Sequence, residues 1–222
     1  MAPKIVFYLF LLVLVVEFQT SFGQDAVNGA YWLADAGVPP SDIDSTLFTH
    51  IFCAFANLDP QTNKVTLPSA SFSQFTSTVR RKNPSIKTLL SIGGGNVARA
   101  NGFSGLDLNW EYPRTTNQMA DLESLLKEWR AAVAAEAASS GRLPLLLTAV
   151  IYYPSKIKEL SYPVQAIQKN LDWINVMAYN FYDPSYSKVA RPHSALYDPA
   201  GPFNLGNRLV ELLAAGIVAI ML

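Results

Sequence analysis

Three polar side chains, Asp107, Asn109 and Glu111, alternate with apolar residues in the stretch GLDLNWEYP. On a β-strand every second residue faces the same side, so the three would form a row on one face, with the intervening apolar residues on the other. Carboxyl and amide groups are costly to bury without partners. A single acid would favour a structural role, but three polar groups followed by an aromatic residue and a proline favour a site that meets a substrate.

The pattern of apolar runs indicates which elements position this row. Near-continuous apolar runs, typical of parallel strands covered on both faces, predict strands at 30–32, 49–58, 87–93, 105–112, 145–152 and 173–182, and 217–222 is a candidate for a seventh. Helical periodicity and stop signals predict helices at 69–81, 117–140, 163–170 and 205–215. Strands that alternate with helices along the chain predict an α/β fold with a parallel sheet.

Two features predict that residues 24–222 form a single TIM (β/α)8-type barrel domain that is incomplete. Only about ten residues, 95–104, join the third and fourth predicted strands, which is short for a crossover with its helix. The chain has 222 residues, whereas such a barrel usually takes about 250. We expect six to seven strands, with the third helix (at most one turn) and the C-terminal strands missing. In a barrel the row points inward, with Asp107 deepest and Glu111 at the carboxyl end of the strand, where active sites lie.

The first 23 residues are typical of a secretory signal peptide. Lys4 precedes an apolar run from Ile5 to Val16, and small residues at Ser21 and Gly23 favour cleavage directly after Gly23. An uncleaved membrane anchor is the alternative, although the run is shorter than the roughly 20 apolar residues that a span needs. We expect a secreted protein, extracellular or vacuolar, with no membrane contact after cleavage.

Charge and composition exclude several classes of partner. The chain has 17 basic and 17 acidic side chains, and its formal net charge of zero gives no indication of nucleic acid binding. His50 and His193 show no metal-ligand spacing, and we predict no metal. The single cysteine, Cys53, lies in an apolar run and is predicted to be buried. We expect a monomer.

The row and three further segments resemble glycoside hydrolase family 18, in particular its plant class V chitinase branch. The family pattern is Asp-x-x-Asp-x-Asp-x-Glu, and here it reads SGLDLNWE. The segments TLFTHIFCAFANLDPQTNKV, FTSTVRRKNPSIKTLLSIGGG and WINVMAYNFYDP agree with the same branch in the same order. The resemblance runs from about Asn28 to Leu213. It implies a barrel that acts on chitin or other β-1,4-linked N-acetylglucosamine oligomers, without metal or cofactor.

The family mechanism implies a role for each member of the row. The acid at Glu111 would protonate the glycosidic oxygen while the acetamido carbonyl of the sugar attacks the anomeric carbon, a substrate-assisted retaining hydrolysis. The residue at Asn109 would accept a hydrogen bond from the acetamido N–H and stabilise the oxazolinium cation, and Asp107 would help to hold it. Tyr179, within MAYN, would steady the acetamido oxygen.

This sequence departs from the family pattern at three positions. Ser104 replaces the first Asp of the pattern, Asn109 the middle one, and Asn180 the Asp of the sixth-strand motif. An amide at 109 can accept a hydrogen bond but offers no full negative charge, and losing one such stabiliser typically costs about 10²–10³ in rate. We therefore expect weak hydrolysis. A lectin-like protein that binds chitin oligosaccharides without cutting them is the alternative, and a gene product that never folds stably is a third interpretation.

Aromatic residues at or just past predicted strand ends extend the predicted site, because sugar rings stack on aromatic faces. The predicted substrate contacts are Tyr31, Phe55, Tyr112, Met177, Asn180 and Tyr182. Ordinary core packing is the alternative for each aromatic ring. The family resemblance suggests a role in defence against fungi or in the handling of chitin-like signals, and these residues favour neither over the other.

Overall fold

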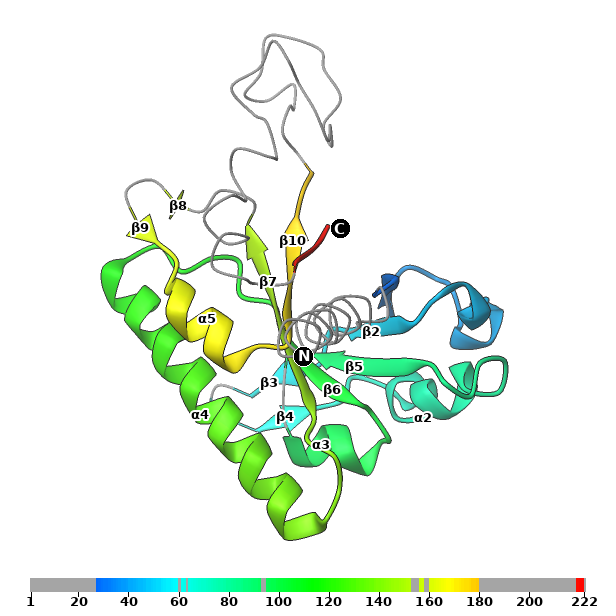
Figure 1. The fold of residues 1–222 in the computed structure, drawn as a ribbon. Helices are drawn as coiled ribbons and strands as arrows, with labels where there is room; N and C mark the ends of the chain where they lie inside the picture. The colour runs from blue at the N-terminus through cyan, green and yellow to red at the C-terminus, as the bar shows by residue number, and fades with distance from the viewer. Residues whose placement is uncertain are drawn as a thin grey trace, which may run out of the picture.

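A seven-stranded parallel sheet forms the framework of the protein (Figure 1). The computed structural model describes residues 27–59, 61–62, 64–92, 95–152, 156–157, 160–179 and 219–221. The strands pair in the order β1-β2-β5-β6-β7-β10-β11, which is their order along the chain, and every neighbouring pair is parallel. The predicted α/β fold with a parallel sheet is therefore confirmed.

The strands of this sheet are short. Their bounds are β1 Gly29–Leu33, β2 His50–Ala54, β5 Lys87–Ser91, β6 Gly105–Leu108, β7 Leu146–Tyr152, β10 Trp173–Met177 and β11 Ala219–Met221. Two antiparallel hairpins lie outside the sheet, β3 (Asn57–Leu58) with β4 (Val65–Thr66) and β8 (Lys156–Ile157) with β9 (Leu160–Ser161). Parallel strands covered on both faces are rich in apolar residues, which is why the apolar runs predicted them.

Helices connect the strands on the outer side of the sheet. They are α2 (Ala70–Val79), α3 (Gly95–Ala100), α4 (Thr116–Ser140) and α5 (Val164–Asn170), with short 3-10 turns at Pro40–Asp42 and Ser45–Leu47. α4 begins where the Thr115 hydroxyl accepts a hydrogen bond from the Gln118 backbone N–H at 3.1 Å. It ends at Gly141, whose φ of 68° lies in the left-handed region that glycine adopts without strain.

The core lies between the sheet and these helices, in two main clusters. One packs the first half of α4 and α5 against β7 and β10, with Met119 and Ile174 among its members. The other packs α2, α3 and the second half of α4 against β2, β5 and β6, with Phe72 and Val133 among its members. Cys53 is fully buried in this second cluster, as predicted. Figure 1 shows α4 and α5 side by side, with α2 and α3 on the other flank.

The sheet curls so far that its first strand reaches its sixth. The Asn175 Nδ2 atom of β10 donates a hydrogen bond of 2.8 Å to the Tyr31 hydroxyl of β1. Within the described residues, β1 and β11 each pair with one strand only, so the sheet is not closed. The fold is an incomplete TIM-type barrel, as predicted, and Ala219–Met221 supplies the seventh strand.

Three element predictions need correction. The third helix is not missing: α3 has six residues, because β5 ends at Ser91 and leaves room for a short helix that stops before Gly102, whose φ is 73°. The strand predicted at 105–112 ends at Leu108, because β5 ends at Ser91 on one side and no residue after Leu108 pairs with β7 on the other, although β7 continues to Tyr152. The run 49–58 divides into β2 and the hairpin strand β3.

Two predictions on the chain's ends fall outside the described residues, namely the signal peptide at 1–23 and the helix at 205–215. Among the helices that the structure does describe, none combines the length and the apolar character needed to cross a bilayer.

Gly105, the first residue of β6, is a position where any side chain would collide with the neighbouring strand. A Cβ atom there would lie 2.6 Å from the Leu146 carbonyl oxygen and 2.7 Å from the Leu146 Cβ atom. We expect Gly105→Ala to lower the free energy of unfolding by about 1–3 kcal/mol, as overpacking does. Urea denaturation measures this loss. Gly29→Ala is the control, because its new Cβ would lie 3.0 Å from a Phe52 ring atom and 3.8 Å from the nearest backbone atom, the His50 carbonyl oxygen, which is ordinary contact distance. Equal losses in the two variants would contradict the steric argument.

Candidate functional site

A groove of about 610 Å³ lies at the carboxyl ends of the first strands of the sheet. It is lined by Phe55, Ala56, Asn57, Leu58, Ile92, Asn109 and Glu111. These residues follow the last residues of β2, β5 and β6, so the groove opens at the end of the barrel where active sites are built. Two members of the predicted row, Asn109 and Glu111, therefore share one cavity.

Asp107, the third member of the row, lies beneath this groove and is fully buried. The parallel register places Ser91 of β5 and Thr148 of β7 directly beside it. Their hydroxyls donate hydrogen bonds of 2.8 Å and 2.7 Å to the two carboxyl oxygens. The Tyr31 hydroxyl donates a third bond of 2.7 Å and the Asn175 Nδ2 atom a fourth of 3.1 Å. Asp107, on β6, is thus hydrogen-bonded to side chains from four other strands, β1, β5, β7 and β10.

Burial and hydrogen bonding act on the Asp107 carboxyl in opposite directions. Burial raises its pKa, because the charged form loses hydration, and the four hydrogen bonds partly offset this rise. Burial also raises the pKa of Tyr31, with the Asp107 charge adding to the effect, so that the phenol keeps its proton and donates a hydrogen bond to Asp107. No face of Asp107 is open to the groove, and its contacts suit it to hold neighbouring residues in place.

Asn109 differs from Asp107 because it has an unused acceptor. Its Oδ1 atom is buried and has no hydrogen-bond partner among the described residues. A buried polar atom left in this state costs about 1–3 kcal/mol, and most such atoms in folded proteins are paired. Because Asn109 lines the groove, a ligand N–H group that enters the groove can supply the missing donor.

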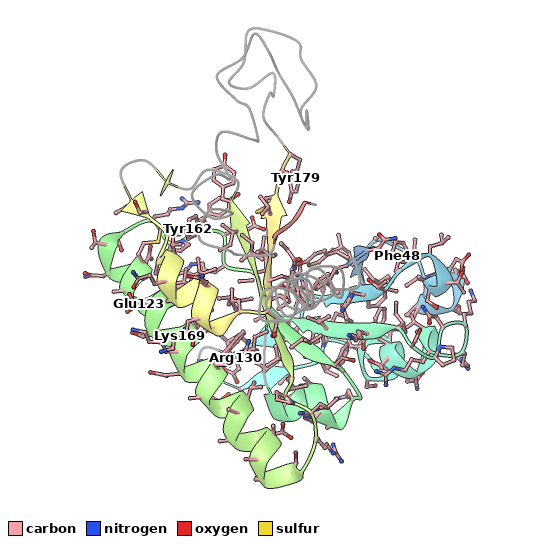
Figure 2. The ribbon with its side chains drawn as sticks, in the orientation of Figure 1. Phe48, Glu123, Arg130, Tyr162, Lys169 and Tyr179 are labelled. Carbon is pink, nitrogen blue, oxygen red and sulfur yellow. The ribbon has the colours of Figure 1, made fainter. Side chains whose placement is uncertain are left out.

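Glu111 stands at the rim, solvent-exposed, with two tyrosines around it. Burial raises the pKa of Tyr112 and of Tyr179, and the Glu111 carboxylate adds to both shifts, so both phenols remain neutral donors near it. Figure 2 shows Tyr179 at the carboxyl end of β10. An acid with open access and two neighbouring phenols can exchange a proton with a ligand in the groove.

The comparisons with known proteins agree with this arrangement. The sequence profile of glycosyl hydrolases family 18 matches residues 27–98 and 95–218 of this chain. This chain belongs to glycosyl hydrolase family 18. Its resemblance to that family, predicted from the row and three segments, is confirmed.

The relatives of this family 18 chain include plant class V chitinases. It is 45% identical to a class V chitinase of Arabidopsis thaliana, over 90% of this chain and 61% of the relative. A class V chitinase from Nicotiana tobaccum, solved in complex with NAG4, is 42% identical with a TM-score of 0.82, over 89% of this chain and 66% of that one. A chitinase-like agglutinin from Robinia pseudoacacia is 40% identical with a TM-score of 0.80, over 88% and 69%. The chain spans about three fifths of the length of the curated relatives it matches.

The family 18 match breaks at the crossover that contains α3. The alignment to the Arabidopsis chitinase has 231 positions, although only 90% of the 222 residues, about 200, take part. About 30 positions of the alignment therefore have no residue in this chain. Because the two matched stretches meet at 95–98, we place at least part of this shortening in the crossover between β5 and β6.

The other predicted site residues of this family 18 chain fall into three groups. Phe55 lines the groove and is 38% exposed, as a ring that stacks on a sugar must be. Tyr112 packs on Tyr152 at the rim, with ring centroids 4.8 Å apart. Tyr31 and Met177 point into the barrel below the groove: Tyr31 stacks on Phe52 and bonds to Asp107, and Met177 is buried. Asn180 and Tyr182 lie outside the described residues.

Four groove residues were not predicted from the sequence of this family 18 chain, namely Ala56, Asn57, Leu58 and Ile92. Asn57 and Leu58 belong to the hairpin strand β3, which the apolar run 49–58 concealed. Ile92 has a φ of 65°, a left-handed conformation that is rare for a β-branched residue, and no local sequence pattern predicts this conformation. Among the described residues, no group of three His, Cys, Asp or Glu side chains is arranged to hold a metal ion.

Proposed function

We propose that this protein binds β-1,4-linked N-acetylglucosamine oligomers in the groove and hydrolyses them slowly. The observation that carries the proposal is the unpaired Oδ1 atom of Asn109, buried in a groove that also holds the exposed acid Glu111. An acetamido group supplies the N–H that this oxygen lacks. A glucose oligomer has a hydroxyl at this position, and a de-acetylated oligomer has an ammonium group, whose charge would have to lose its hydration to reach the buried amide oxygen.

In this proposal each residue has a separate task. Glu111 donates a proton to the glycosidic oxygen, and the acetamido carbonyl of the sugar attacks the anomeric carbon, so that no enzyme nucleophile is needed. Asn109 accepts the acetamido N–H. Asp107 holds the backbone of β6 through its network and does not touch the sugar. Phe55 and Tyr112 offer ring faces, and Tyr179 a phenol, at the edge of the groove.

A second function, binding without hydrolysis, is favoured by the same residue. The oxazolinium intermediate carries a positive charge, and the amide of Asn109 meets it with a dipole only. One relative of similar identity is described as a chitinase-like agglutinin. We also propose, on the sequence alone, that the chain is secreted, acts as a monomer and takes part in plant defence.

Calorimetric titration with tetramers of N-acetylglucosamine and of glucosamine tests the binding. We expect the acetylated tetramer to bind at least about tenfold more tightly, since one satisfied buried acceptor is worth roughly 1.4 kcal/mol. Asn109→Leu should remove this preference, whereas Gln168→Leu, which replaces an exposed amide on α5, should keep it. Equal affinity for the two tetramers in the unmodified protein would contradict the role of Asn109.

Product analysis after incubation with the acetylated tetramer separates the two functions. Shorter oligomers that appear with the unmodified protein and disappear with Glu111→Gln indicate hydrolysis. Binding without any shorter product indicates the lectin-like function. Glu111→Gln keeps the size and polarity of the side chain, so it should still bind the tetramer and thereby show that the groove is intact.

A further inference from the structure

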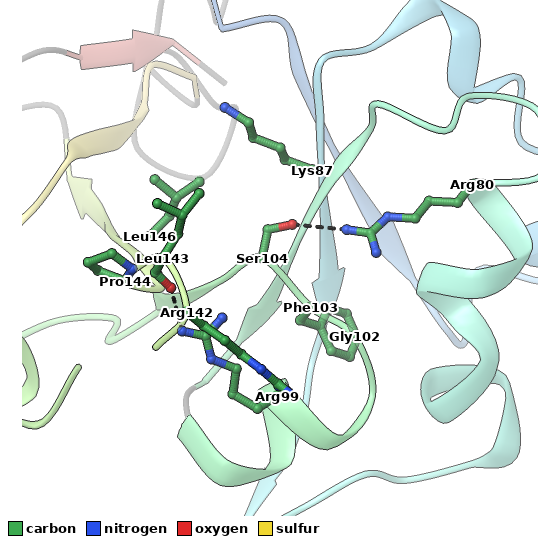
Figure 3. Close-up of a pocket in the computed structure, with 10 residues that line it drawn as sticks. All are labelled: Arg80, Lys87, Arg99, Gly102, Phe103, Ser104, Arg142, Leu143, Pro144 and Leu146. Carbon is green, nitrogen blue, oxygen red and sulfur yellow. Dashed lines mark hydrogen bonds between the residues drawn. The ribbon is translucent and has the colours of Figure 1, made fainter. Parts of the chain in front are cut away.

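A second cavity, of about 390 Å³, lies at the amino ends of β5, β6 and β7, at the opposite end of the strands from the groove (Figure 3). Lys87 and Leu146 are the first residues of β5 and β7, and Ser104 directly precedes β6. Four of the lining side chains are cationic, Arg80, Lys87, Arg99 and Arg142, and none is acidic. This cavity shares no residue with the groove.

Only one of the four cations has an ion-pair partner among the described residues. Arg99 binds Glu136 with both its Nε and Nη2 atoms, the latter at 2.7 Å, and also donates to the Leu143 carbonyl. The Glu136 carboxylate is thereby occupied: the Arg99 hydrogen bond is the main cause of its lowered pKa, and Arg142 contributes least. Lys87 and Arg142 make no side-chain hydrogen bond or ion pair within the described part of the chain. Both are solvent-exposed at the mouth of the cavity.

Within the described residues, Arg80 is held in place by neutral acceptors alone. Its Nε atom donates to the Ile86 carbonyl at 3.4 Å and its Nη2 atom to the Ser104 hydroxyl at 3.2 Å. Figure 3 shows this guanidinium directed at Ser104. The family pattern has an aspartate at the position of Ser104, and an aspartate there would set a carboxylate against Arg80. The serine instead leaves the charge of Arg80 uncompensated and adds a hydroxyl that can itself donate.

The three uncompensated cations come from three different elements. Arg80 ends α2, Lys87 begins β5, and Arg142 follows the end of α4. Donors that approach from several sides suit a tetrahedral oxyanion, whereas a planar carboxylate pairs best with a single guanidinium. We propose that this cavity binds a small ligand through a phosphate or sulfate group, with Arg80, Lys87, Arg142 and the Ser104 hydroxyl as its contacts.

Two features tie this site to what distinguishes the chain from its relatives. Arg99, Gly102, Phe103 and Ser104 all belong to the crossover at which the family match breaks. Ser104 is also one of the departures from the family pattern. The nearby His50 adds no charge, because burial and the neighbouring Lys87 lower its pKa to about 4. At neutral pH the four cationic side chains of the cavity therefore outnumber the one acid that pairs with them, Glu136, by three.

Calorimetric titration of the full chain with inorganic phosphate and with glucose 6-phosphate, at constant ionic strength set by chloride, tests the site. We expect saturable binding with a dissociation constant on the order of 1 mM, the affinity that a few partly solvated charge-assisted bonds provide. If inorganic phosphate binds more tightly, the site prefers a free anion; if glucose 6-phosphate binds more tightly, the site prefers an esterified phosphate. Heat indistinguishable from that of added chloride overturns the proposal.

Matched variants make the test specific. Lys87→Gln and Arg142→Gln should each weaken phosphate binding about tenfold, with unchanged melting temperature because neither side chain makes a hydrogen bond or ion pair in the described part of the chain. Ser104→Asp should abolish binding, since its carboxylate would occupy Arg80. Arg81→Gln, on the same turn as Arg80 but outside the cavity lining, should bind like the unmodified protein. Phosphate affinity equal in Ser104→Asp and in the unmodified protein overturns the site. Because no variant touches the groove, this result is independent of oligosaccharide binding.

Discussion

Asn109→Asp is expected to increase the rate of N-acetylglucosamine oligomer hydrolysis about 10²–10³-fold. Asn109 lines the groove beside Glu111, and its unpaired Oδ1 atom can accept the acetamido N–H. An aspartate accepts the same hydrogen bond and adds a full negative charge next to the oxazolinium cation. Because this cation forms only during the reaction, the charge stabilises the transition state more than the bound substrate and should raise kcat more than it lowers KM.

The new carboxylate should also change the pH dependence of the reaction. A negative neighbour favours the protonated form of Glu111, which is the form that donates the proton. Activity falls as the pH rises and this proton is lost, so the alkaline limb of the pH–rate profile should move to higher pH in Asn109→Asp. Initial rates with the acetylated tetramer, measured from pH 4 to pH 9 for both proteins, give the two profiles.

The double variant Asn109→Asp with Glu111→Gln is the control for this prediction. It keeps the added charge and removes the proton donor, so it should lose the gain while it still binds the tetramer. If Asn109→Asp binds normally and melts at the same temperature but cleaves no faster, the amide does not limit the reaction. The limit would then lie in parts of the groove away from residue 109.

Local pattern was enough to predict the elements that build the site. The apolar runs and the helical spacing in α4 depend on neighbours within one element, and these are what a sequence shows directly. The alternation in GLDLNWEYP likewise predicted which face each residue takes: Leu106, Leu108 and Trp110 pack against the helices, and Asp107 faces inward. The prediction of which face each residue of this strand takes therefore agrees with the structure.

Predictions that depend on several strands at once were less complete. Tyr31 lies 76 residues from Asp107 and Asn175 lies 68 residues from it, and only the curl of the sheet brings the three side chains together. Tyr31 was predicted to contact the substrate because it lies at a predicted strand end, yet its hydroxyl is occupied by two hydrogen bonds below the groove. No local signal distinguishes an aromatic side chain that lines a groove from one that supports it.

The end of β6 shows the same limit for the backbone. The row was predicted on one continuous strand, but pairing stops at Leu108, so Asn109 and Glu111 lie beyond the ladder. Asp107 is locked in the sheet, Asn109 lies just above it, and Glu111 is free at the rim. The point at which pairing with β5 and β7 stops therefore separates the structural Asp107 from Asn109 and Glu111, which can meet a ligand.

Asp107→Ala is expected to lower the free energy of unfolding by about 3–5 kcal/mol, the cost of leaving buried polar partners without their acceptor. Four donors lose their bond, namely the hydroxyls of Tyr31, Ser91 and Thr148 and the Asn175 amide. Asp107→Asn is the matched variant: its amide keeps the shape, and the three hydroxyls can rotate to accept as well as donate. We expect a loss below about 1.5 kcal/mol for Asn, measured by urea denaturation.

The unmodified protein and Asp107→Asn should also differ in how their stability depends on pH. Burial raises the pKa of Asp107, so the folded state holds this proton more tightly than the unfolded chain, in which an aspartate has a pKa near 3.9. The stability that protonated Asp107 contributes is thus complete below about pH 4 and is lost as the pH rises through the folded pKa. Asp107→Asn has no such group, so the free energy of unfolding of the unmodified protein should fall relative to that of the variant between pH 4 and pH 8. A difference that instead grows with pH would show that the four hydrogen bonds to the carboxylate outweigh its burial.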